Sequence, residues 1–117
     1  MEPRLKSAIW VDAFLRRAAI AGKNGAVLRK GAEEAGTVFV VINHLDGTHS
    51  VLGPPPGPSH DAEGNRLFEH LSPTPIDWPA VRDLLDRRTR HDSDHWRVEV
   101  DDRDGLAGLT PISTNPG

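Results

Sequence analysis

The sequence predicts an α+β fold, with a largely antiparallel sheet of about five strands and two helices packed on one face of it. Three observations support this prediction. Apolar residues recur at helical spacing in two segments, β-branched residues concentrate in short runs, and Asp46-Gly47 is a dipeptide typical of a hairpin. The chain has 117 residues, of which 37% are hydrophobic and 26% charged, and this suits one globular domain.

The N-terminal part is predicted to form a strand and then a helix. Residues 4–10 fit a short strand with Leu5 and Ile9 on one face. The period then changes, because apolar side chains recur at helical spacing over residues 11–19. Gly22 is suited to end this helix.

The centre of the sheet is predicted at residues 38–42, after a strand at residues 26–29. Every residue of 38–42 is apolar, so both faces of this strand are expected to be covered. The Asp46-Gly47 turn then joins it to an antiparallel strand at residues 48–52. Two helices on one face of the sheet leave the other face open, and a second copy of the chain would cover it. The sequence therefore predicts a homodimer.

The second half is predicted to hold a loop, a short strand, a helix and a last strand. Residues 53–64 include four prolines and three glycines, which indicates a surface loop before a short strand at residues 66–71. Asp77 is suited to cap the second helix. The buried stripe of this helix is expected to consist of Trp78, Val81, Leu84 and Leu85. Residues 96–100 alternate between apolar and charged, which indicates a one-faced strand near a sheet edge or against solvent.

One α+β domain is expected over residues 1–103, followed by a flexible C-terminal tail over residues 104–117, which is rich in Asp, Gly and Pro. The first residues lack the apolar core of a signal peptide. No stretch reaches the roughly 20 apolar residues that a membrane helix needs. We therefore expect a cytoplasmic protein without membrane contact.

Charge and cysteine content exclude several classes of protein. The net charge is −3, with acids and bases mixed, whereas nucleic-acid-binding domains usually carry a basic excess. The chain has no cysteine, which excludes disulfides and thiolate zinc sites. Its histidines include His44 and His49 around the hairpin turn and His91 and His95 near the last strand. Neither group has the spacing of a known metal site, so we predict no metal and no cofactor.

The charged turn between the second and third predicted strands is the first candidate binding site. Arg29 and Lys30 could hold an anionic ligand, and Glu34 could act as a base. The alternative is a solvated turn whose geometry depends on Gly31 and Gly36.

The basic end of the second helix is the other candidate. Arg87 and Arg88 could contact the phosphates of a nucleic acid. They could equally complement the dipole at the C-terminal end of the helix.

Four stretches of the chain carry a resemblance to a known family. They are Arg4-Leu5-Lys6 with Trp10-Val11 and Arg16-Arg17; Arg29-Lys30-Gly31 with Glu34-Ala35-Gly36; Leu52-Gly53-Pro54; and residues 92–99. In these stretches the chain resembles an alphaproteobacterial family of short, uncharacterised proteins, the domain of unknown function 1491. The resemblance implies a bacterial cytoplasmic protein, and it carries over no catalytic residue.

These observations favour a non-enzymatic binding or accessory domain that acts through protein–protein contacts. The reasons are the lack of a recognisable catalytic motif and the two-sided apolar strand. Two alternatives stay open. One is a small-ligand or enzymatic site around Arg29, Lys30 and Glu34, and the other is weak nucleic-acid binding through Arg87 and Arg88. The sequence leaves open whether the protein is an enzyme.

Overall fold

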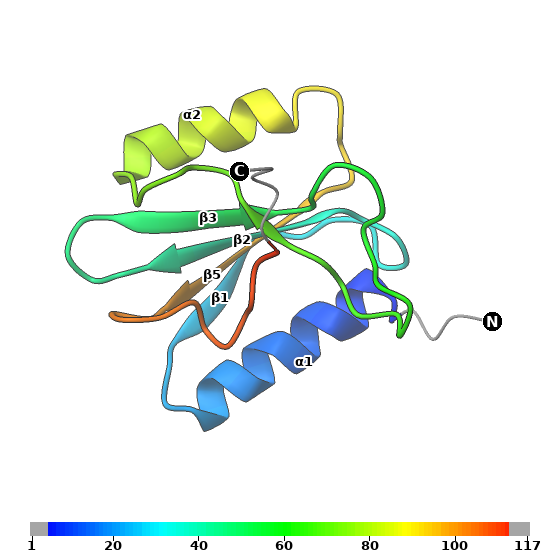
Figure 1. Ribbon diagram of the computed structural model, residues 1–117, viewed down its shortest axis with the longest axis horizontal. Helices are drawn as coiled ribbons and strands as arrows, with labels where there is room; N and C mark the ends of the chain where they lie inside the picture. Colours follow the sequence, from blue (N-terminus) through cyan, green and yellow to red (C-terminus); the bar gives the residue numbers. More distant parts are fainter. Residues whose placement is uncertain (1–4, 113–117) are drawn as a thin grey trace.

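The computed structural model of the protein describes residues 5–112, which form one five-stranded sheet and two helices (Figure 1). In chain order the elements are α1 (Ser7–Ile20), β1 (Gly25–Arg29), β2 (Val38–Asn43), β3 (His49–Gly53), β4 (Glu69–His70), α2 (Trp78–Arg88) and β5 (Trp96–Asp101). The strand order is β1-β5-β2-β3-β4; the β2–β5 pair is parallel and the other three pairs are antiparallel. The predicted α+β class and largely antiparallel sheet are confirmed. Within the described residues, neither helix is long and apolar enough to cross a membrane.

The two helices lie on opposite faces of the sheet, with α1 below it and α2 above it in Figure 1. Val40 of β2 packs in one core cluster with Phe14 of α1, whereas Val41 packs in another with Val81 and Leu85 of α2. The prediction that both faces of β2 are covered is confirmed. The prediction that both helices share one face is wrong, because each helix buries one side of this strand. The open apolar face that motivated a homodimer is therefore closed by the chain itself, and the dimer stays a prediction without that support.

The helix α1 begins at Ser7, so the strand predicted over residues 4–10 is wrong where the structure describes it. The first residue of this helix forms hydrogen bonds with the turn before β2. The backbone N–H of Ser7 donates to the Glu34 carbonyl at 3.1 Å, and Ser7 Oγ donates to the Gly36 carbonyl at 2.6 Å. Lys6 occupies the N-cap, and its side chain has no acceptor to offer the first N–H groups. A distant segment thus fixes the start of α1, and the local sequence pattern cannot reveal it.

The helix α2 begins at the predicted cap, since the Ala80 N–H donates to Asp77 Oδ1 at 3.0 Å. Val81 and Leu85 are buried as predicted. Trp78 is 38% exposed, so its predicted place in the buried stripe is wrong. Trp78 lies in the first turn of α2, and part of its ring is exposed to solvent.

The segment that follows β5 packs against the α1 side of the sheet. Leu106 and Leu109 contact the core cluster there, and the Ile112 N–H donates to the Phe68 carbonyl at 2.8 Å. These contacts take apolar side chains out of water. Residues 104–112 thus contact the domain, while the flexibility of the predicted tail stays a prediction and the rest of that tail lies outside the described residues.

Candidate functional site

Arg29, at the end of β1, links two segments of the chain. Its guanidinium donates hydrogen bonds to the carbonyl of His95 and, at 2.9 Å, to the carbonyl of Ser93. Close by, Trp96 Nε1 donates to the Ala32 carbonyl at 2.8 Å. These bonds tie the turn after β1 to the loop before β5, so Arg29 has a structural task in the fold.

Lys30 and Glu34 contact different partners. Lys30 Nζ lies 3.6 Å from Glu33 Oε1, and Glu34 Oε1 lies 3.5 Å from Lys6 Nζ, both pairs being solvent-exposed. Glu34 lines a pocket near the start of α1, whereas Arg29 lines a groove beside α2. The three residues predicted as one site are therefore not gathered around one cavity.

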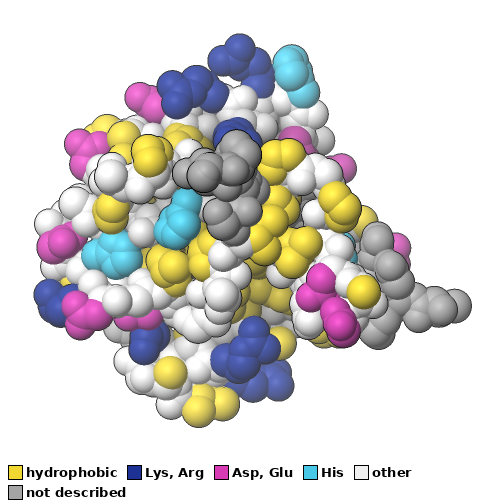
Figure 2. Space-filling view, in the orientation of Figure 1, with side chains coloured by type: hydrophobic (Ala, Val, Ile, Leu, Met, Phe, Trp, Pro, Cys, Tyr) yellow, Lys and Arg dark blue, Asp and Glu magenta, His cyan; other side chains and the backbone are white. Residues whose placement is uncertain are grey.

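Arg87 and Arg88 are exposed in the last turn of α2. Figure 2 shows basic side chains over α2 at the top of the view and a second group over α1 at the bottom. Because the two helices cover opposite faces of the sheet, Arg16 and Arg17 of α1 cannot extend the basic end of α2. The nucleic-acid alternative thus loses the continuous basic face that phosphate contacts would use.

His44 and His49 lie against protein polar groups. His44 Nδ1 lies 2.8 Å from the Asp102 carbonyl oxygen, and its Nε2 lies 2.8 Å from Ser50 Oγ. His49 Nδ1 lies 3.2 Å from the Ile76 carbonyl oxygen. Within residues 5–112, no three histidine or carboxylate side chains come together in an arrangement that could hold a metal ion.

His95 is a buried histidine, 4% exposed, whose hydrogen bonds require the neutral ring. Nδ1 donates to the Asp92 carbonyl at 2.8 Å, and Nε2 accepts from Arg97 Nε at 3.0 Å. Burial lowers the pKa of His95, the Asp92 carbonyl opposes this, and the charges of Arg29 and Arg97 lower the pKa further. Protonation of Nε2 would turn the bond from Arg97 into a clash of two donors.

This arrangement predicts that the protein loses stability as the pH falls from about 7 to about 5. Because folding lowers the pKa of His95 from 6.5, the unfolded chain binds more protons between the two pKa values. The free energy of unfolding therefore increases with pH through that window, and the contribution of His95 to it is lost on acidification. Urea unfolding of the wild type and of His95→Gln at both pH values measures the effect. The variant should show a smaller difference, and an equal difference in both proteins would contradict this role of His95.

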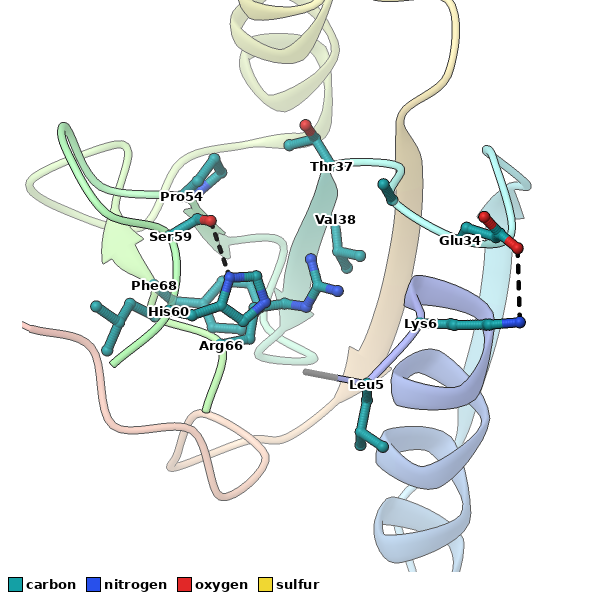
Figure 3. Close-up of a pocket in the computed structure, with 12 residues that line it drawn as sticks. Leu5, Lys6, Glu34, Thr37, Val38, Pro54, Ser59, His60, Arg66 and Phe68 are labelled. Carbon is teal, nitrogen blue, oxygen red and sulfur yellow. Dashed lines mark hydrogen bonds and ion pairs between the residues drawn. The ribbon is translucent and has the colours of Figure 1, made fainter. Parts of the chain in front are cut away.

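A pocket of about 270 Å³ opens between the start of α1, the turn before β2 and the loop after β3 (Figure 3). Its apolar wall is formed by Leu5, Val38, Pro54, Leu67 and Phe68. Its polar groups come from Arg66, His60, Ser59, Thr37 and the Lys6–Glu34 ion pair. An apolar cavity with a few convergent polar groups is typical of a site for a small molecule.

Arg66 is the charged group at the centre of this pocket. Figure 3 shows its guanidinium between His60 and Val38. Nη2 donates to Ser7 Oγ at 3.2 Å, Nε is buried without a hydrogen-bond partner, and the guanidinium carbon lies 5.7 Å from the centre of the Trp10 ring. Burial lowers the pKa of Arg66. In the described part of the chain, no carboxylate forms an ion pair with this side chain.

The sequence contains no local signal that marks Arg66. It is one of 14 basic residues, and it belongs to a stretch predicted as a strand over residues 66–71. The structure restricts β4 to Glu69–His70, so that prediction is wrong for the start of the stretch. The groups that contact Arg66 come from α1, which is far away in the sequence, and the pocket exists only after folding.

The fold and the pocket define a small α+β domain whose sheet carries one helix on each face. The chain belongs to the family described as a protein of unknown function, DUF1491, whose profile matches residues 5–110. It is similar to a protein of A. tumefaciens with a solution structure, at 36% identity over 97% of this chain and 98% of that one, with a TM-score of 0.79. It is also similar to a DUF1491 family protein from Caulobacter crescentus with a crystal structure, at 32% identity over 93% of this chain and 99% of that one, with a TM-score of 0.74. No curated protein matches the chain. The predicted family is confirmed, and both relatives come from alphaproteobacteria.

Proposed function

We propose that the protein binds a small organic anion, a carboxylate or a phosphate with a short apolar part, in the pocket around Arg66. One observation carries this proposal. Arg66 places a partly buried guanidinium in the cavity, and no carboxylate within residues 5–112 pairs with it. Removing a cation from water costs several kcal/mol unless an anion compensates the charge. An oxyanion in the pocket would supply that compensation, and arginine is well suited to bind one.

The rest of the pocket fits such a ligand. Ser59 Oγ lies 3.0 Å from His60 Nδ1 on the wall beside Arg66, so this wall adds polar surface next to the guanidinium. Leu5, Pro54 and Leu67, each at least partly exposed, provide an apolar surface for the carbon part of the ligand. The volume of about 270 Å³ limits the ligand to a small molecule.

This proposal keeps the small-ligand alternative from the sequence and changes its anchor. Glu34 contributes to the pocket wall and is paired with Lys6. Arg29 and Lys30 do not line this pocket, so Arg66 takes the role of anion binder that the sequence suggested for them.

Titration with simple anions tests the proposal. Butyrate and butyl phosphate are the probes, and butylamine is the cationic control. In nitrogen-15-labelled protein, both anions should shift the amide resonances of Thr37, Val38 and Phe68, whereas butylamine should not. Arg66→Met removes the charge but keeps an apolar side chain beside Trp10. It should weaken anion binding about tenfold or more, because a hydrogen bond to a charged group contributes about 1.5–3 kcal/mol.

The thermal midpoint separates a binding role from a structural one. Loss of an unpaired, partly buried charge should leave the midpoint of Arg66→Met unchanged or raise it. Arg103→Met changes an exposed arginine outside the pocket and should bind the anions like the wild type. Equal shifts in Arg66→Met and the wild type, or no shift with either anion, would rule the proposal out.

A further inference from the structure

A second surface lies on the other face of the sheet, between β1 and α2. It is a groove of about 340 Å³ with an apolar floor. The floor consists of Leu28, Trp78, Val81 and Leu85. None of these residues lines the Arg66 pocket, so the groove is a separate feature.

The groove runs beside an open strand. The strand order places β1 at one edge of the sheet, paired on one side with β5. The outward edge of such a strand presents N–H and C=O groups that another extended chain can pair with. Val27 and Leu28 are 42% and 43% exposed in the middle of β1. The register shifts between Val27 and Arg29, and both Leu28 and Arg29 line the groove beside α2.

The rim of the groove is basic. Arg29, Arg82 and Arg97 line it. Arg97 Nη2 forms an ion pair with Asp86 Oδ1 at 3.0 Å, whereas the hydrogen bonds of Arg29 go to backbone carbonyls. In the described part of the chain, no ion pair involves Arg82. Three arginines against one carboxylate favour an acidic occupant, and they disfavour a second copy of the chain, which would bring the same arginines to the contact.

We propose that β1 and this groove form a docking site for an extended, acidic segment of another protein. The segment adds to the open edge of β1 as a further strand, and its backbone pairs with β1. An apolar side chain of this strand enters the groove between Leu28 and Trp78. Acidic side chains two residues away from it lie on the same face of the added strand and pair with Arg29 and Arg82. On this proposal, β1 and the groove are the surface through which the protein makes the protein–protein contacts that its sequence favours.

Two pools of short peptides test this proposal by fluorescence anisotropy on the full chain. Both pools carry a central valine or leucine with threonine on either side of it. The residues two positions away from the central one are aspartate or glutamate in one pool and lysine in the other, so that apolar and charged side chains share one face of the strand. The acidic pool should bind the wild type, with an affinity that falls as salt is added, and the lysine pool should not. Arg82→Glu should weaken binding of the acidic pool about tenfold or more, as expected when a charge pair becomes a repulsion. Arg103→Glu, a change of an exposed arginine outside the groove, should leave it unchanged.

The variant Leu28→Asp tests whether apolar contact contributes to peptide binding in addition to charge. It should abolish binding of the acidic pool while the thermal midpoint of the protein stays unchanged. Absence of binding by the acidic pool at millimolar concentration, or equal binding by the lysine pool, would overturn the proposal. So would a wild type that sediments as a dimer and becomes a monomer in Leu28→Asp, because a second copy would then occupy β1. The variant Arg66→Met should bind the peptides like the wild type, which keeps this test independent of the anion pocket.

Discussion

Val40→Asp is expected to abolish folding. Val40 is fully buried in the centre of β2, with Leu52 of β3 and Val98 of β5 as its neighbours in the sheet. Its side chain lies in the core cluster that β2 shares with α1. An unpaired carboxylate there costs several kcal/mol even when it is protonated, which is comparable to the whole stability of a small domain, about 5–15 kcal/mol. Circular dichroism and soluble yield at 25 °C measure the loss.

Val27→Asp is the matched control for this change, because it places the same side chain on the edge strand β1. Val27 is 42% exposed, so the new carboxylate can stay in water. The cost should be about 1 kcal/mol or less, within the range of strand propensities. A soluble Val40→Asp with native circular dichroism would show that the centre of the sheet has been misplaced.

The central part of the fold is predictable because its signals are local. Residues 38–42 are apolar on both faces, and that pattern alone indicates a strand covered on both sides. The hairpin to β3 follows from the turn dipeptide Asp46-Gly47. The prediction of both helices on one face is wrong because β2 is apolar on both faces. Each face therefore needs a helix to cover it. The start of α1 was out of reach, because a loop more than twenty residues away completes it.

The candidate site was much less predictable than the fold. Its pocket combines the start of α1, the turn before β2 and the loop after β3, which meet only in the folded chain. The sequence pattern points to Glu34, which lines the pocket, but it does not point to Arg66. What distinguishes Arg66 from other arginines is its burial without a carboxylate partner in residues 5–112, and burial is a property of the tertiary structure.

Two of the stretches that carry the family resemblance pack against each other. Residues 29–36 and residues 92–99 are joined by the hydrogen bonds of Arg29 and by the Ala32 N–H, which donates to the Asp94 carbonyl at 2.9 Å. The sequence pattern indicates that the glycines of the first stretch form a turn. In the structure, Gly31 lies directly against the backbone of the second stretch, where a side chain would not fit. The motif therefore describes a junction between two backbone segments.

Gly31→Val should consequently destabilise the protein strongly. A Cβ atom at this position would overlap the carbonyl oxygen of Asp94 and would lie 2.6 Å from the carbonyl carbon of His95. Both atoms belong to the backbone of the segment that leads into β5, so they cannot move aside without shifting that strand. Overpacking usually costs about 1–3 kcal/mol, and valine at a backbone contact should lie at or above the upper end of that range. The urea midpoint measures this loss.

Ala35→Val is the comparison that isolates the contact. Ala35 is exposed in the same turn, so the added methyl groups meet solvent, and stability should change by about 0.5 kcal/mol at most. Because Trp96 also binds this turn through the Ala32 carbonyl, Gly31→Val should further displace the indole, and tryptophan fluorescence should change while the chain is still folded. If Gly31→Val unfolds at the same urea concentration as Ala35→Val, the two stretches do not pack as closely as the structure shows, and the structural explanation of the motif fails.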